Sequence, residues 1–256
     1  MKTISILGST GSIGCNALDV IRLHPDKFDI FALSGHENVD LLFTQAVEFN
    51  PSYIVTKDEK SQVRLTKLLK EKKINIEVLF GPDGYRFIAG HEKVSIVLAA
   101  ITGAAGLIST MEAAMKGKKI LLANKESMVM AGEMINDLLA KHSCNLLPVD
   151  SEHSAIWQCL KGESKHQIKR IILTGSGGPF RTKPKDEFNQ ITKKQALQHP
   201  NWEMGNKITI DSATMMNKGL EVIETFWLFG VKSNQIDIVI HPESIIHSMV
   251  EFVMGL

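Results

Sequence analysis

Short hydrophobic runs recur through the first half of the chain, and amphipathic stretches with helical spacing lie between them. The runs predict strands at residues 3–7, 28–33, 53–56, 77–80, 95–99, 119–123 and 146–149. The stretches between them predict helices, for example at residues 13–23, 39–49, 59–70 and 106–116. Regular alternation of this kind is typical of βαβ units, so we predict an α/β fold with a doubly wound parallel sheet.

The pattern changes after residue 150. A helix predicted at 154–160 precedes a strand at 168–174, and a long irregular segment follows at 176–206. Irregular segments of this length are uncommon unless they cover a site or are disordered. We interpret this one as a mobile cover over a site, with a disordered surface loop as the alternative.

The last part of the sequence alternates like a strand at residues 244–253 and then stops without a turn or cap. We therefore expect the chain to be part of a longer polypeptide. An unpaired edge at this strand would normally be covered or paired. His241 and His247, which lie beside it, are interpreted as structural histidines.

Composition narrows the possible settings and partners. The 256 residues are 44% hydrophobic and 22% charged, as in folded globular proteins, and the net charge of +1 argues against a nucleic-acid partner. No apolar run approaches the ~20 residues of a membrane span, and the strand at 3–7 leaves no room for a signal peptide. Cys15, Cys144 and Cys159 show no metal-binding spacing, which favours free thiols. We predict a cytoplasmic protein with no membrane partner.

A glycine loop, GSTGSIG at residues 8–14, follows the first predicted strand. Its glycines allow a tight turn and close approach of a pyrophosphate to a helix N-terminus, which predicts a nucleotide cofactor. A plain strand-to-helix turn is the alternative. At the end of the second strand, an acid favours a free ribose hydroxyl and a base favours a 2′-phosphate. His36 beside Glu37 leaves that choice open.

Acidic and amide residues follow two later strands, at 124–126 and 150–152. Ligands of open parallel sheets bind beyond these carboxyl ends. Asp150 and Glu152 are two residues apart, so in an extended segment both side chains face one way. With a third oxygen ligand they would suit Mg²⁺ or Mn²⁺. Helix capping by Asp150 or Ser151 is the alternative.

The segment DSATMMNKGLE at residues 211–221 predicts a helix with a polar face. Asn217, Lys218 and Glu221 are spaced to share that face. Ser212, at the predicted N-terminus, offers a hydroxyl where the helix dipole favours an anion. A solvated Lys218–Glu221 pair is the alternative. Together, the loop and the polar clusters suggest a nucleotide cofactor, a metal ion and an anionic substrate in one cleft.

Six sequence motifs match one protein family, and they occur in the same order as in that family. They are GSTGSIG at residue 8, LLANKES at 121, PVDSEHSAI at 148, TGSGGPF at 174, HPNWEMG at 199 and DSATMMNKGLE at 211. Over its whole length the chain resembles the 1-deoxy-D-xylulose 5-phosphate reductoisomerases. The resemblance implies a homodimeric oxidoreductase of the non-mevalonate isoprenoid pathway, dependent on NADPH and on Mn²⁺ or Mg²⁺. Such an enzyme rearranges and reduces its substrate to 2-C-methyl-D-erythritol 4-phosphate.

The resemblance also implies residue roles. The implied metal ligands are Asp150, Glu152 and Glu221, which with Lys125 are the implied catalytic group. The implied substrate contacts are Lys125, Ser151, Glu152, Ser176, His199, Ser212, Asn217, Lys218 and Glu221, with Trp202 and Met204 on the lid. The implied cofactor contacts are Thr10, Gly11, Ser12, Ile13, Gly35, Asn38, Asn124, Glu126 and Gly205.

We therefore predict a Rossmann-like NADPH-binding domain at residues 1–149 and an α+β catalytic domain for metal and substrate at 150–256. The chain departs from the family at His36 and Glu37, where members usually have a small residue and then often a base. Members also continue past residue 256 into a C-terminal helical domain that is absent here. The alternatives are a catalytically incomplete cofactor-binding fragment and another NAD(P)-dependent dehydrogenase.

Overall fold

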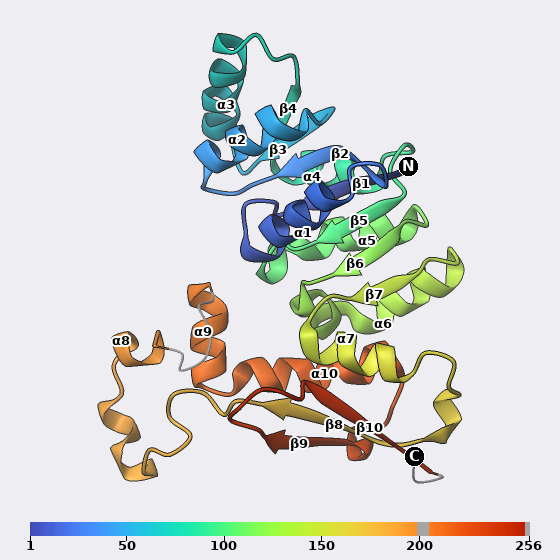
Figure 1. Cartoon of the computed structure of the whole chain (residues 1–256), viewed down its shortest axis with the longest axis vertical. Coiled ribbons are helices and arrows are strands. Elements are labelled where there is room, and N and C mark those ends of the chain that lie inside the picture. The colour runs from blue at the N-terminus through green and yellow to red at the C-terminus, as the bar shows by residue number, and fades with distance from the viewer. Residues whose placement is uncertain (199–204, 254–256) are drawn as a thin grey trace. The chain divides into compact units, whose positions relative to one another are not determined.

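The computed structural model describes residues 1–198 and 205–253, which form two compact units, Met1–Leu147 and Pro148–Leu256 (Figure 1). The first unit contains a seven-stranded sheet with the order β4-β3-β2-β1-β5-β6-β7. The strand pairs from β4 through β6 are all parallel. The strands are β1 (Lys2–Leu7), β2 (Phe28–Ser34), β3 (Tyr53–Thr56), β4 (Glu77–Phe80), β5 (Ile96–Ala99), β6 (Lys119–Leu122) and β7 (Leu146–Pro148).

Helices connect the strands of this sheet. They are α1 (Ser12–Leu23), α2 (Val39–Phe49), α3 (Glu59–Glu71), α4 (Gly81–Gly90), the short η1 (Gly103–Gly106), α5 (Leu107–Met115) and α6 (Lys125–Lys141). One set packs α2 against α3, and the other packs α5 against both α4 and α6. The central strand β5 is a continuous hydrophobic run, IVLA, because all four of its residues are buried. The predicted doubly wound parallel sheet is therefore confirmed.

The second unit contains a three-stranded sheet. Its central strand β8 (Ile168–Gly175) is parallel to β9 (Ile236–Ile240) and antiparallel to β10 (Ser248–Phe252). The core of the unit joins β8 to two helices, α7 (Ser151–Cys159) and α10 (Met216–Phe229), through buried side chains that include Ile156, Ile171, Leu173 and Phe229. The other elements are η2 (Lys165–Gln167), η3 (Lys185–Gln190), α8 (Lys193–Ala196), α9 (Asn206–Ala213) and η4 (Ser233–Gln235).

Several predicted boundaries in this unit are wrong. Helix α7 begins at Ser151 rather than residue 154. The segment at 176–206, predicted to be irregular, contains η3 and α8, the latter fixed by a capping box at Thr192. Strand β10 covers only Ser248–Phe252 of the predicted 244–253.

The helix predicted from residue 211 is two helices. Helix α9 ends at Ala213 and α10 begins at Met216, because Met215 has a left-handed backbone with φ of 60°. Left-handed backbone is uncommon for a residue with a side chain and stops a right-handed helix. The propensities of the segment favour helix on both sides of this turn, so the sequence pattern alone did not reveal the break.

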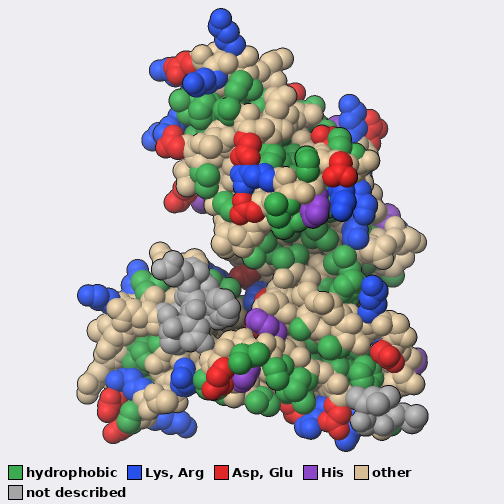
Figure 2. All heavy atoms as spheres, viewed as in Figure 1, with side chains coloured by type: hydrophobic (Ala, Val, Ile, Leu, Met, Phe, Trp, Pro, Cys, Tyr) green, Lys and Arg blue, Asp and Glu red, His purple; other side chains and the backbone are tan. Residues whose placement is uncertain are grey.

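Charged side chains of both signs are mixed with apolar ones on the face shown in Figure 2, in keeping with a net charge of +1. Cys15, Cys144 and Cys159 are all free thiols. Across the described ranges, no helix is both long and apolar enough to cross a lipid bilayer.

Candidate active site

Three carboxylates converge in the second unit. Asp150 precedes α7, Glu152 lies in the first turn of α7, and Glu221 lies on α10. Each offers one oxygen, and the three oxygens lie within 4.8 Å of one another. Glu221 is only 1% exposed, while Asp150 and Glu152 are half-buried. Hard divalent cations prefer carboxylate oxygens in this arrangement, so the three residues fit a Mg²⁺ or Mn²⁺ ion.

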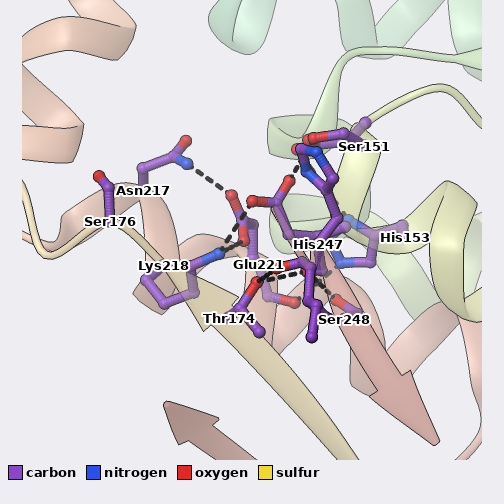
Figure 3. A network of polar contacts seen from close by, with 12 residues as sticks. Ser151, His153, Thr174, Ser176, Asn217, Lys218, Glu221, His247 and Ser248 are labelled. Carbon is purple, nitrogen blue, oxygen red and sulfur yellow. Dashed lines mark hydrogen bonds and ion pairs between the residues drawn. The ribbon is translucent and has the colours of Figure 1, made fainter. Parts of the chain in front are cut away.

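Positive charge already faces these oxygens. The ammonium group of Lys218 donates a hydrogen bond to Glu221 Oε2 and lies 3.4 Å from Glu152 Oε1 (Figure 3). Asn217 Nδ2 donates to Glu221 Oε1 at 2.5 Å. A buried carboxylate is costly unless a charge and hydrogen bonds compensate it. Lys218 is 5% exposed and Glu221 is 1% exposed, so the alternative of a solvated pair is wrong.

The beginning of α7 differs from the extended segment that the sequence suggested. Asp150 occupies the N-cap position, where its backbone carbonyl accepts a hydrogen bond from the Ser154 amide at 2.8 Å. Its side chain makes no capping hydrogen bond, so the capping alternative is also unsupported. Glu152 lies within the helix and accepts a hydrogen bond from Ser151 Oγ at 2.7 Å. The two acids come together through the first helical turn rather than through the alternation of a strand.

Glycines bring the end of β8 close to both later helices. A Cβ added at Gly175 would lie 2.9 Å from Lys218 Cε. A Cβ added at Gly178, whose φ is +67°, would lie 2.7 Å from the backbone oxygen of Ser212. Ser176 lies between these two glycines, on the side of the site where Figure 3 shows Asn217. The contact of Gly178 with a backbone oxygen and its positive φ require glycine there, whereas the contact of Gly175 is with the flexible end of a lysine side chain.

The predicted position of Ser212 at a helix N-terminus is wrong. Ser212 lies at the C-terminal end of α9, where the helix dipole disfavours an anion. The helix N-terminus nearest in sequence is that of α10, whose first turn carries Asn217 and Lys218. An anion at this end of the unit is therefore favoured by the start of α10 and by the Lys218 ammonium group.

Two glycines of the loop at 8–14 are required by packing in the first unit. Gly8 has a φ of +90°, and a Cβ there would lie 2.6 Å from the oxygen of Ala100. A Cβ at Gly14 would lie 2.3 Å from the oxygen of Gly8. Both contacts are far shorter than real Cβ atoms show, so the loop and α1 pack this closely only with glycine.

Gly11 is different, because the protein does not fill the space beside it. An added Cβ would meet only the oxygen of Gly8, at 3.4 Å. Gly11 is exposed at the N-cap of α1, and no side chain makes a capping hydrogen bond to that helix. The first amide groups of a helix bind anions, and a missing Cβ lets a ligand approach them. The loop therefore fits the pyrophosphate of a dinucleotide.

The segment after β2 touches the glycine loop and carries charges of both signs. A Cβ at Gly35 would lie 3.0 Å from the Thr10 side chain, and Asn38 caps α2 by accepting a hydrogen bond from the Leu41 amide at 3.1 Å. Glu37 Oε1 lies 3.7 Å from Lys57 Nζ, at the end of β3. The acid at the end of β2 therefore has a cationic neighbour that the sequence pattern did not indicate.

Comparisons with known proteins identify the family of the chain. The family model described as 1-deoxy-D-xylulose 5-phosphate reductoisomerase matches residues 4–132, and that of its C-terminal domain matches residues 146–229. The reductoisomerase of Chlorobaculum tepidum is 53% identical over 255 residues, covering 100% of this chain and 66% of its own length. The chain belongs to the 1-deoxy-D-xylulose 5-phosphate reductoisomerase family.

Other reductoisomerases show the same relation. The enzyme of Thermoanaerobacter pseudethanolicus is 51% identical over 255 residues, which are 100% of this chain and 66% of that protein. A crystal structure of DOX-P reductoisomerase in complex with NADPH, fosmidomycin and magnesium superposes with a TM-score of 0.95 at 46% identity, covering 100% of this chain and 65% of the other. The enzyme of Zymomonas mobilis in complex with NADPH gives a TM-score of 0.91 at 43% identity, over 100% of this chain and 65% of that one. The present chain thus spans about two thirds of the length of these reductoisomerases.

The family resemblance implies that Asn124 contacts the cofactor. In the structure its side chain makes hydrogen bonds within the first unit. It is 1% exposed, accepts a hydrogen bond from the Ser127 amide at 2.9 Å, and donates to the oxygen of Gly103 at 3.0 Å. These bonds fix the start of α6, where the neighbouring Lys125 is 6% exposed and Glu126 is half-buried. The roles of these three residues in the reductoisomerase stay predictions.

The remaining implied residues lie beside helix N-termini or outside the described residues. Gly205 is exposed at the N-cap of α9. Thr10 is half-buried, whereas Ser12 and Ile13 are exposed in the first turn of α1. Three of the implied residues, His199, Trp202 and Met204, lie outside the described residues.

Two buried residues beside the carboxylates are not among the residues predicted from the sequence. His153 and Glu224 are 0% and 1% exposed. His153 follows Asp150 by three residues on α7, and Glu224 follows Glu221 by three residues on α10. This spacing places each beside a proposed ligand on the same helix. That periodicity was a signal available in the sequence.

Proposed function

We propose that this chain forms the cofactor-binding and metal-binding parts of a reductoisomerase that converts 1-deoxy-D-xylulose 5-phosphate to 2-C-methyl-D-erythritol 4-phosphate. The reaction would use NADPH and a divalent cation, Mg²⁺ or Mn²⁺. The observation that carries this proposal is the convergence of Asp150, Glu152 and Glu221 within 4.8 Å. Crystal structures of related reductoisomerases in complex with NADPH and with magnesium support the choice of cofactors.

The carboxylate site would hold the cation that polarises the oxygens of the substrate. A divalent cation held by Asp150, Glu152 and Glu221 supplies Lewis-acid chemistry toward the ketone and hydroxyl oxygens of a sugar phosphate. Lys125 is proposed to stabilise negative charge that develops on the substrate during rearrangement. These assignments place the cleavage and rejoining of the carbon skeleton beside the carboxylates.

Lys218 has two possible partners for its ammonium group. In the structure it faces Glu152 and Glu221. With a cation held by these acids, the Lys218 ammonium group would be available to bind the phosphate of the substrate. Ser176, Ser212 and Asn217 are proposed to complete the phosphate site. Phosphate binding remote from the reacting carbons would supply energy to orient them.

The preference for NADPH rests on groups at the ends of β2 and β3. Glu37 is an acid at the position that commonly reads the ribose, which favours a free hydroxyl. His36 Nδ1 and Lys57 Nζ each lie 3.7 Å from its carboxylate. We propose that these two bases provide the positive charge for a 2′-phosphate, with Glu37 reducing the preference for NADPH over NADH.

Turnover and binding need to be measured side by side. The chain is assayed with deoxyxylulose phosphate, NADPH and Mn²⁺ by loss of NADPH absorbance, and calorimetry measures NADPH binding alone. The proposal expects metal-dependent turnover that a chelator abolishes. Activity that survives chelation would instead favour another dehydrogenase, and binding without turnover would favour a cofactor-binding fragment.

Glu221→Gln tests the metal role directly. The amide keeps the shape of the side chain but removes the charge of a ligand, so metal-dependent turnover is expected to be abolished. The affinity for NADPH is expected to stay nearly unchanged, because the glycine loop belongs to the other compact unit. Equal loss of both properties in this variant would contradict the assignment.

A homodimer in the cytoplasm is also proposed. Strands β9 and β10 are the edges of the sheet in the second unit, and exposed edges are usually paired or covered. The free thiols at Cys15, Cys144 and Cys159 suit a reducing compartment. Light scattering during size-exclusion chromatography measures the mass in solution, and a purely monomeric chain would contradict the dimer.

A further inference from the structure

A histidine and a glutamate lie buried directly behind the three carboxylates, and neither has a role in the proposed reaction. His153 comes from α7 and Glu224 from α10. They are 0% and 1% exposed. Burying a carboxylate is unfavourable unless a partner compensates it, so Glu224 at this position needs a physical reason.

His153 joins the two helices that carry the proposed metal ligands. Its Nε2 lies 3.1 Å from the backbone oxygen of Glu221 and 3.0 Å from Thr225 Oγ1. The Thr225 hydroxyl donates its hydrogen to the same Glu221 oxygen at 2.7 Å. A carbonyl only accepts and a hydroxyl has one hydrogen to give, so Nε2 must be a donor. The tautomer of His153 is therefore fixed on this side.

The other ring nitrogen faces two acids. His153 Nδ1 lies 3.3 Å from Glu224 Oε2 and 4.0 Å from Asp150 Oδ2. The ring also stacks on Phe229, with centroids 6.4 Å apart and an angle of 10° between the planes. Contacts on both nitrogens and on the ring face leave His153 with one orientation, in which Nδ1 points between Glu224 and Asp150.

We propose that Glu224 and His153 are a positioning pair for the metal site, an inference that rests on the proposed function. Glu224 orients His153, which in turn holds the Glu221 turn of α10 at a set distance from the start of α7. Asp150 and Glu152 belong to that start, so the pair fixes the separation of the ligands on the two helices. Partners behind metal ligands commonly change metal affinity by about 10-fold to 100-fold when removed.

Variants at Glu224 test the pair through Mn²⁺ affinity, measured by electron paramagnetic resonance on the intact chain. Glu224→Leu removes the oxygen that faces Nδ1 and is expected to weaken Mn²⁺ binding at least about 10-fold. Glu224→Gln keeps an oxygen there and is expected to stay within about 3-fold of the wild type. Unchanged affinity in Glu224→Leu would overturn the proposal, as would an equal loss in Glu224→Gln, which would indicate charge rather than position.

A matched control and a second variant complete the experiment. Glu243 lies 3.2 Å from His241 Nδ1 in an exposed pair of the same kind, so Glu243→Leu is expected to leave Mn²⁺ affinity unchanged. Should Glu224→Leu fail to fold, Thr225→Val tests the same contacts with a side chain of the same shape. It removes the hydroxyl beside His153 and is expected to weaken Mn²⁺ binding at least about 3-fold, while wild-type affinity would refute the pair.

The stoichiometry of Mn²⁺ distinguishes positioning from direct ligation. Ligand atoms of Asp150, His153 and Glu224 also lie within 4.8 Å of one another. One ion per chain supports the positioning role, whereas a second ion that is lost in Glu224→Leu would make the pair ligands instead. If the wild-type chain binds NADPH but no Mn²⁺, the proposed function fails. If the wild-type chain binds Mn²⁺ and Glu224→Leu binds it equally well, the positioning role alone fails.

Discussion

Replacing Lys218 by methionine would separate the two sources of positive charge at the carboxylate site. Methionine keeps an unbranched stem beside Gly175, where the lysine stem packs, but removes the ammonium group that faces Glu152 and Glu221. Breaking one side of a buried pair costs about 3–5 kcal/mol. Asn217 still donates to Glu221 at 2.5 Å, so we expect the lower end, about 3 kcal/mol.

This loss should depend on the divalent cation. For a unit of this size, about 3 kcal/mol corresponds to a fall in Tm of roughly 12 °C. A ligand present at 100 times its Kd stabilises the folded state by about 2.7 kcal/mol. In Lys218→Met, Mg²⁺ no longer competes with an ammonium group for the same oxygens. Saturating Mg²⁺ is therefore expected to restore most of the lost stability, and to raise Tm more than it does in the wild type.

The assay is thermal unfolding followed by circular dichroism, with Mg²⁺ and with a chelator. Lys207→Met is the matched control, because Lys207 Nζ pairs with Asp211 at 2.6 Å while its side chain is 50% exposed. An exposed pair contributes about 0–1 kcal/mol, so little change and no new dependence on Mg²⁺ are expected. A loss in Lys218→Met that is the same with and without Mg²⁺ would refute the reasoning, since it would reflect packing alone.

Two further predictions concern the first unit and the thiols. Gly11→Ala is expected to weaken NADPH binding by calorimetry at unchanged Tm, because the nearest atom to its Cβ is 3.4 Å away. Gly14→Ala, whose Cβ would meet an oxygen at 2.3 Å, is expected to lower Tm; the opposite pattern would contradict the cofactor loop. Burial raises the pKa of the Cys144 thiol, which reduces its thiolate fraction near pH 8, whereas Cys159 is exposed to a reagent in solution. Iodoacetamide followed by mass spectrometry is expected to label Cys159 first, and faster labelling of Cys144 would refute this.

The sequence alone determined the alternating architecture of the first unit and the place of its glycine loop between β1 and α1. Each of β3 and β4 is a short run rich in apolar residues, and their bounds are those that the pattern predicted. Local spacing also determined that Asn217 and Lys218 share a helix face with Glu221, since positions three and four apart meet on any helix.

Tertiary structure decided the parts of the site that depend on distant segments. The break at Met215 moved Ser212 to the end of α9, and helical propensity carries no sign of such a turn. The burial of Lys218 depends on Gly175 of β8, far away in the sequence. The contact between His153 of α7 and Glu224 of α10 likewise requires both helices to pack on one core, which periodicity within either helix cannot show.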